Sequence, residues 1–132
     1  MDYDDVVKLV KNNLGNDEYK KGSEYDEDYI RYPRKYRLDI NEYQYVFNVE
    51  SERTWRYYDV IITTKNNTLN SMYCSCPQHF QYHKCKHIAA CLLHYQDFIF
   101  PKPKDPYEVT ADFLKSFKPS IIKSSNIKQQ LK

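Results

Sequence analysis

The segment Ser71–Tyr95, which reads SMYCSCPQHFQYHKCKHIAACLLHY, decides how this chain folds. It contains two pairs of metal-binding side chains, Cys74 with Cys76 and Cys85 with His87, and each pair has one residue between its members. Eight residues separate the pairs, which is long enough for the chain to reverse direction. Four thiol and imidazole ligands are the number that closes a tetrahedral structural zinc site. The segment therefore predicts one zinc ion bound by these four residues.

The predicted zinc is structural, because protein side chains fill all four positions and leave none for water or substrate. The sequence contains no His-Glu-x-x-His motif, no glycine-rich phosphate loop and no paired-carboxylate signature. We therefore expect that these 132 residues are not an enzyme.

Other histidines of the segment offer alternatives. His79 and His83 lie between the two pairs and could replace His87 as the fourth ligand. His94 lies two turns beyond His87, and we interpret it as a surface residue rather than as a group that contacts a ligand.

The cysteines have alternatives too. Cys91 lies outside the pairs on the apolar side of a predicted helix, which is typical of a small buried side chain. The other three could act as a redox sensor, with a disulfide between Cys74 and Cys76 or between Cys76 and Cys85. An acidic start without a basic, apolar leader predicts a cytoplasmic protein, in which thiols stay reduced. Reduced, clustered cysteines favour metal binding.

Charge is distributed unevenly along the chain. Residues 1–30 contain nine acidic side chains against four lysines, a net charge of −5, and because the whole chain carries +2 the remainder carries +7. A total this mild does not indicate nucleic-acid binding by itself, and we interpret the charges as a solvated, mixed surface. No apolar run approaches the roughly 20 residues that a membrane helix needs.

Apolar and polar residues alternate in the middle of the chain, which predicts an α+β fold with a small antiparallel sheet. A helix is expected over 2–14, with Asp2 or Asp4 as its cap and Gly15 at its end. The polar residues 16–28 predict a loop. Four strands are expected, over residues 36–40, 43–50, 57–64 and 69–73. The hairpin that pairs 56–64 with 68–74 leads directly into the first cysteine pair.

The second ligand pair leads into another helix, expected over 86–99, with a buried stripe formed by Ile88, Cys91, Leu92, Tyr95 and Ile99. Pro101 ends this helix. A further helix is expected over 106–117, followed by a linker. The predicted organisation is a zinc-binding domain over 1–100, with a finger core over 56–98, and a helix and linker over 101–132 that lead to a downstream region.

The pattern Cys-x-Cys-x8-Cys-x-His resembles the SWIM zinc finger, with Pro77 after the second cysteine and the run Cys85-Lys86-His87-Ile88-Ala89-Ala90 opening a helix. The resemblance implies strands followed by a helix around one zinc ion, with Cys74, Cys76, Cys85 and His87 as ligands. SWIM domains occur near the N-terminus of bacterial Swi/Snf-type helicase-like ATPases, in Mutator-like transposases, and in some ubiquitin-ligase-like and recombination-associated proteins. The early position of the motif in this chain is most similar to the ATPase arrangement.

The resemblance implies a non-catalytic accessory module of such an ATPase that contacts DNA or a protein. A DNA contact would combine basic and aromatic side chains, namely Lys84, Lys86, Arg53, Arg56, Trp55, Tyr57 and Tyr58. We expect the aromatic residues to pack the sheet instead, because aromatic residues at strand spacing are usually core. The two lysines would also offset the net charge of −1 on a zinc ion with three thiolates. The alternative function is a protein–protein or intramolecular regulatory module without DNA binding, for which the acidic segment 17–28 is the candidate surface.

Overall fold

The computed structural model describes residues 2–82 and 84–102, so the helix predicted over 106–117 and the linker after it lie outside the described part. The described elements are α1 (Tyr3–Leu14), α2 (Asn16–Ser23), the 3-10 turn η1 (Glu27–Tyr29), β1 (Ile30–Asp39), β2 (Glu42–Glu50), β3 (Tyr57–Lys65), β4 (Thr68–Cys74), α3 (Pro77–Tyr82), α4 (Lys86–His94) and α5 (Gln96–Ile99). The predicted α+β class is confirmed. None of the described helices has the length and hydropathy needed to cross a membrane.

The sheet is an antiparallel meander in which each strand pairs with the next along the chain, in the order β1-β2-β3-β4. The predicted hairpin is confirmed, with Val60 opposite Cys74 and Lys65 opposite Thr68. Asn66 and Asn67 form its turn with φ angles of 53° and 60°. A two-residue hairpin turn requires such positive φ values, and asparagine tolerates them better than other residues with a side chain.

The first strand is longer than predicted, because it begins at Ile30 instead of residue 36. Its pairing with β2 shifts register between Arg31 and Arg34, around Pro33. Proline is tolerated here because β1 lies at the edge of the sheet. The shift breaks the alternation of apolar and polar residues by which a strand is recognised in the sequence.

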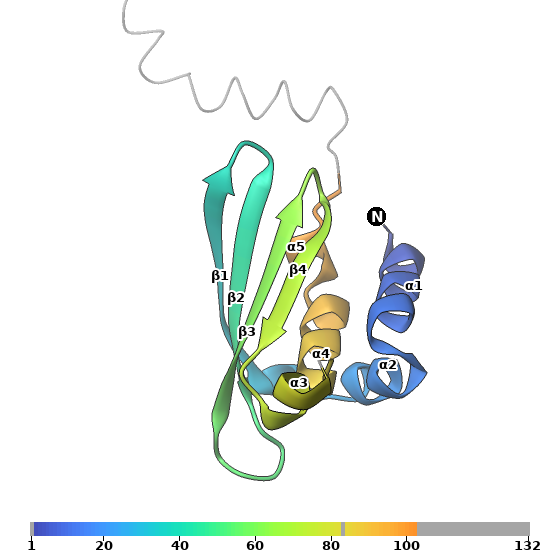
Figure 1. The fold of residues 1–132 in the computed structure, drawn as a ribbon, viewed down its shortest axis with the longest axis vertical. Coiled ribbons are helices and arrows are strands. Elements are labelled where there is room, and N and C mark those ends of the chain that lie inside the picture. Colours follow the sequence, from blue (N-terminus) through green and yellow to red (C-terminus); the bar gives the residue numbers. More distant parts are fainter. Residues whose placement is uncertain (1, 83, 103–132) are drawn as a thin grey trace, which may run out of the picture. The chain divides into compact units, whose positions relative to one another are not determined.

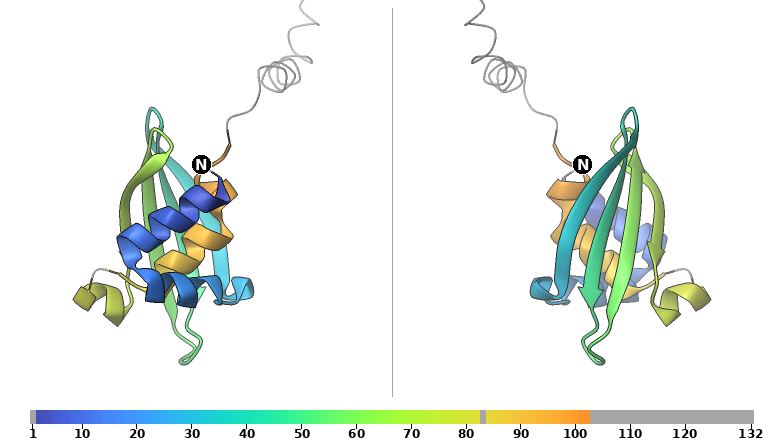
Figure 2. Two further views of the ribbon diagram at one scale, coloured as in Figure 1. Left: turned by 90° about the vertical axis from the view of Figure 1, so that its right-hand side faces the viewer. Right: turned by 90° about the vertical axis from the view of Figure 1, so that its left-hand side faces the viewer.

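The helices α1, α2, α4 and α5 lie on one face of the sheet, with α4 between the sheet and the pair α1 and α2, whereas α3 lies to the side, past the end of β4 (Figures 1 and 2). Every residue of α4 from His87 to Leu93 is buried. A helix with neighbours on both sides must be apolar around its whole circumference. The predicted stripe is therefore only one part of the buried surface of α4, and Tyr95, its fourth member, is partly buried. The predicted helix over 86–99 is interrupted at Tyr95, whose φ of −120° separates α4 from α5.

The first helix forms as predicted, and the loop predicted over 16–28 is wrong. Asp2 caps α1 and shares a capping box with Asp5. Gly15, with φ of 96°, then turns the chain so that α2 follows at once. The helix α2 packs against α4 through Gly22, which is buried. Because this close backbone contact holds α2 in place, the helix does not need a row of large apolar side chains. Its composition therefore resembles that of a loop.

Candidate metal centre

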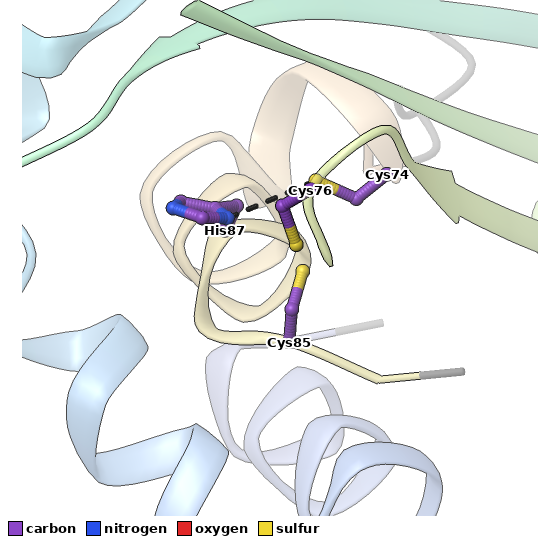
Figure 3. A group of neighbouring side chains, drawn as sticks. All are labelled: Cys74, Cys76, Cys85 and His87. Atoms are coloured by element: carbon purple, nitrogen blue, oxygen red, sulfur yellow. Dashed lines mark hydrogen bonds between the residues drawn. The ribbon is translucent and has the colours of Figure 1, made fainter. Parts of the chain in front are cut away.

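The two ligand pairs stand before and after the short connection that contains the helix α3. Cys74 is the last residue of β4, and Cys76 follows two residues later. Cys85 is the N-cap of α4, and His87 lies in its first turn. The helix α3 occupies the connection between the pairs, for which the sequence predicted only a reversing loop. Figure 3 shows that the four side chains converge from the end of the strand and the start of α4.

The four ligand atoms form one compact group. The sulfur atoms of the three cysteines and a ring nitrogen of His87 all lie within 4.8 Å of one another. Cys74 Sγ is 3.7 Å from His87 Nδ1 (Figure 3). With Zn–S bonds of about 2.3 Å and Zn–N bonds of about 2.0–2.1 Å, neighbouring ligands of a tetrahedral site lie roughly 3.6–3.8 Å apart. The group could therefore hold one metal ion with small adjustments of its side chains.

Burial isolates this group from solvent. The exposed fractions are 1 % for Cys74, 2 % for Cys76, 0 % for Cys85 and 6 % for His87. The His87 ring packs edge-on against Tyr25, with centroids 5.6 Å apart, and lies 5.1 Å from the ring of Tyr58. These aromatic neighbours fix the orientation of the imidazole. A metal ion in this position would be enclosed by protein, which is typical of a structural site.

The pKa values of the side chains indicate how they respond to a cation. A hydrogen bond with Cys85, together with burial, raises the pKa of Cys76 to about 12. A hydrogen bond with Cys74, together with burial, raises the pKa of Cys85 to about 12. Burial lowers the pKa of His87, which keeps the imidazole in the neutral form that binds metals. A divalent cation would favour the thiolates, because its positive charge offsets the cost of burying them.

Two backbone features also favour thiolates at this place. The N-terminus of α4 lies at Cys85, and the positive end of a helix dipole stabilises a nearby negative charge. The backbone N–H of His79 donates a hydrogen bond of 3.4 Å to Cys76 Sγ. Neither feature supplies a further ligand, but both lower the cost of charge on sulfur.

The rival ligands lie elsewhere or outside the described residues. His79 is buried beside the group and packs its ring edge-on against Tyr73, but it is not one of the four converging ligands. His83 lies outside the described part of the chain. His94 is the last residue of α4, where its Nδ1 is 3.9 Å from Glu27 Oε1, and it is partly buried rather than the surface residue that the sequence predicted. Cys91 is fully buried in the core, as predicted. All four cysteines are free thiols.

The flanking lysines take different positions. Lys86 Nζ donates to Glu52 Oε1 at 3.2 Å and lies 5.7 Å from the centre of the Tyr25 ring. Its charge is therefore directed at the β2–β3 connection. Lys84 is exposed. This arrangement ties the first turn of α4 to the loop that follows β2.

The expectation that the aromatic residues pack the sheet is wrong for Trp55 and Tyr57. Trp55 is 90 % exposed and Tyr57 is half exposed, whereas Tyr58 is partly buried against His87. The sequence carried a signal for this difference, because Trp55 stands between polar residues and arginines in Arg53-Thr54-Trp55-Arg56 and does not alternate with apolar residues.

Comparisons with protein-family models, curated proteins and solved structures gave no match for this chain. A functional assignment therefore depends on the geometry of the site and on the ligand motif.

Proposed function

We propose that this chain is a non-catalytic module built around one structural zinc ion, and that it serves as the N-terminal accessory domain of a bacterial Swi/Snf-type helicase-like ATPase. The observation that carries the metal part of the proposal is the buried convergence of Cys74, Cys76, Cys85 and His87 within 4.8 Å. The resemblance of the ligand motif to SWIM fingers supports the ATPase part.

The ligand set favours zinc over other metals. Thiolate and imidazole ligands suit zinc, whereas calcium and magnesium require oxygen ligands. Three cysteines and one histidine in a buried tetrahedral arrangement form a recognised class of structural zinc site. Because the protein supplies all four ligands, the ion would fasten β4 to α4 and take no part in catalysis.

The described surface near this centre supports a contact with DNA. Arg53, Trp55 and Arg56 are exposed on the connection between β2 and β3, and Tyr57 is half exposed beside them. Lys84 is exposed on the metal-binding segment. Lys86 and Tyr58, which belong to the same set in the sequence, are engaged with Glu52 and His87 and would act by supporting the surface.

A protein–protein or intramolecular regulatory module without DNA binding is the second candidate. It is favoured by the acidic side chains that the segment 17–28 exposes, of which Asp17, Glu24, Asp26, Glu27 and Asp28 are members. Glu18 is excluded from this surface, because it is buried and accepts a hydrogen bond from Gln78 at 3.3 Å.

Metal analysis of the purified 132-residue chain, followed by a chelator titration monitored by circular dichroism, tests the proposal. We expect about one zinc per chain and loss of the fold when zinc is removed. A chain that lacks metal and keeps its fold in chelator would contradict the structural-zinc assignment. Binding of the zinc-loaded chain to DNA at two salt concentrations then separates the two candidates, because phosphate contacts weaken as salt rises.

A further inference from the structure

The connection between β2 and β3, Ser51–Arg56, is called the tip loop here, and it projects beyond the sheet at the end where the metal centre lies (Figure 1). Trp55, the one tryptophan in the sequence, is 90 % exposed on this loop. We propose that the tip loop binds single-stranded nucleic acid, with the indole of Trp55 stacked on a base and with Arg53 and Arg56 on neighbouring phosphates. The inference rests on the proposed function, since it names the ligand class of the DNA-contacting surface.

The tip loop has a defined structure. The backbone N–H of Ser51 donates to the carbonyl oxygen of Arg56 at 2.8 Å and closes the loop. Ser51 Oγ accepts hydrogen bonds from the backbone N–H groups of Arg53 and Thr54, at 3.2 and 3.3 Å. A loop ordered before binding loses less conformational entropy when its ligand arrives.

The backbone of Trp55 is in an unfavourable conformation. Its φ is +32°, a value that residues with bulky side chains rarely adopt. The same residue leaves a large aromatic surface in water, although tryptophan normally buries most of its area. Residues in strained backbone conformations cluster at functional sites, ligand-binding segments among them. Stacking on a nucleic acid base would cover the indole, and every base offers a face for it.

The charges around the tip loop leave its two arginines available. Glu50 pairs with Arg31 at 3.4 Å, and Glu52 pairs with Lys86 at 3.2 Å. Arg53 and Arg56 are exposed, and within residues 2–82 and 84–102 neither forms an ion pair. Guanidinium groups suit phosphate because their planar donors match its oxygens.

The form of the surface favours a single strand over a duplex. One indole on a narrow loop can stack on an unpaired base, whereas the bases of a duplex are covered by their neighbours. Tyr29, at the end of η1, adjoins the base of the loop, and η1 exposes Glu27 and Asp28. Exposed carboxylates on η1 disfavour phosphate contacts on that element. A duplex that requires a broad basic surface is therefore disfavoured.

The fluorescence of Trp55 provides a direct test, because the zinc-loaded chain contains no other tryptophan. An oligothymidylate of about eight nucleotides and a duplex of the same length are titrated separately while the emission is recorded. We expect the single strand to quench the emission and to bind more tightly than the duplex. With two phosphates neutralised, log K should fall with log[salt] with a slope of about −1.4.

Substitutions separate stacking from charge. Trp55→Leu should weaken binding of a labelled oligothymidylate about 5- to 150-fold, and Trp55→Tyr should retain most of it because a ring remains. Replacing both arginines, Arg53→Gln with Arg56→Gln, should remove the salt dependence. Arg37→Gln is the matched control and should leave binding unchanged, because Arg37 is exposed and lies toward the end of β1 that is distant from the tip loop. Circular dichroism and zinc content establish that each variant remains folded.

The outcomes distinguish this inference from the proposed function. A chain that holds one zinc but shows no quenching by the single strand, or equal or tighter binding of the duplex, overturns the inference and leaves the structural zinc standing. Tight DNA binding that Trp55→Leu does not weaken overturns the inference and supports a DNA contact elsewhere. A chain without zinc contradicts the proposed function, while quenching by oligothymidylate would still support the tip loop as a binding site.

Discussion

Gly22 of α2 lies directly against Ala89 of α4, so closely that a Cβ atom at position 22 would come 2.5 Å from the Ala89 Cβ and 2.8 Å from the Ala90 backbone nitrogen. Real side chains do not approach to such distances, and the obstruction includes backbone atoms. The contact explains why one of only two glycines in the chain stands inside a helix.

Gly22→Ala is expected to destabilise the fold by about 1–3 kcal/mol, because the added methyl group forces α2 away from α4. A decrease in the free energy of unfolding would be informative, because replacing glycine by alanine inside a helix normally stabilises the helix by about 1 kcal/mol. Urea denaturation of the variant measures the change. Lys21→Ala, at the exposed neighbouring position, is the control and should change stability by no more than about 0.5 kcal/mol. Equal stability of Gly22→Ala and the parent would show that the helices can separate without cost.

His87→Ala and His79→Ala decide which histidine completes the metal group. We expect His87→Ala to hold less than one zinc per chain, because one of four ligands is removed. We also expect its fold to be lost at a lower chelator concentration than the fold of the parent chain. His79→Ala should retain about one zinc per chain, since the ring of His79 is directed at Tyr73. Metal content determined by mass spectrometry after gel filtration is the measurement, and the reverse result would exchange the roles of the two histidines.

Zinc binding should release protons and weaken as the pH falls. The pKa of about 12 for Cys76 and for Cys85 means that both thiols are protonated at pH 7 before a cation arrives. Zinc takes up thiolates, so each thiol that binds it gives up a proton. Because the lowered pKa of His87 leaves the imidazole neutral at pH 7, it contributes to proton release only at lower pH. Calorimetric titration in two buffers of different ionisation enthalpy counts the protons, and a count near zero would mean that the cysteines are not the ligands.

Tyr25→Phe tests the link between the core and the tip loop. The Tyr25 hydroxyl donates a short hydrogen bond to the carbonyl oxygen of Glu50, just before the loop begins. Its removal leaves that carbonyl without this donor and should cost about 1–2 kcal/mol of stability. Zinc content should not change, because the ring that packs against His87 is kept. Tyr36→Phe, on a half-exposed tyrosine, is the control and should be neutral.

The hairpin and the metal group could be predicted from the sequence because the information is local. The Asn66-Asn67 turn pairs Lys65 with Thr68, and after a register shift between Thr63 and Thr64 the two strands place Cys74 opposite Val60. The second ligand pair follows within the same short stretch, where Cys85 opens a helix of good helix formers. The short spacing of the four ligand residues along the chain therefore corresponds to their convergence in the structure.

The features that were missed depend on tertiary contacts. The helix α2 has a polar composition and is held by the approach of Gly22 to α4, which no local pattern records. β1 begins early because its edge position tolerates Pro33 and a register shift. Exposure of Trp55 follows from the length of the β2–β3 connection, which carries the residue beyond the sheet. A pattern of apolar residues indicates which side chains can be buried, but it does not indicate which helix or strand packs against them.

The position of α4 between the sheet and the first two helices has a consequence for synthesis on the ribosome. The helices α1 and α2 emerge first, yet each packs against α4, which emerges after all four strands. We expect the early helices to remain without their main partner until α4 has been made, while the meander can already form from neighbouring segments. The same segment carries Cys85 and His87. The second pair of metal-binding residues is therefore made together with the helix that covers the sheet, α1 and α2. A nascent chain that pauses just before Cys85 would be the form most exposed to aggregation and most in need of a chaperone.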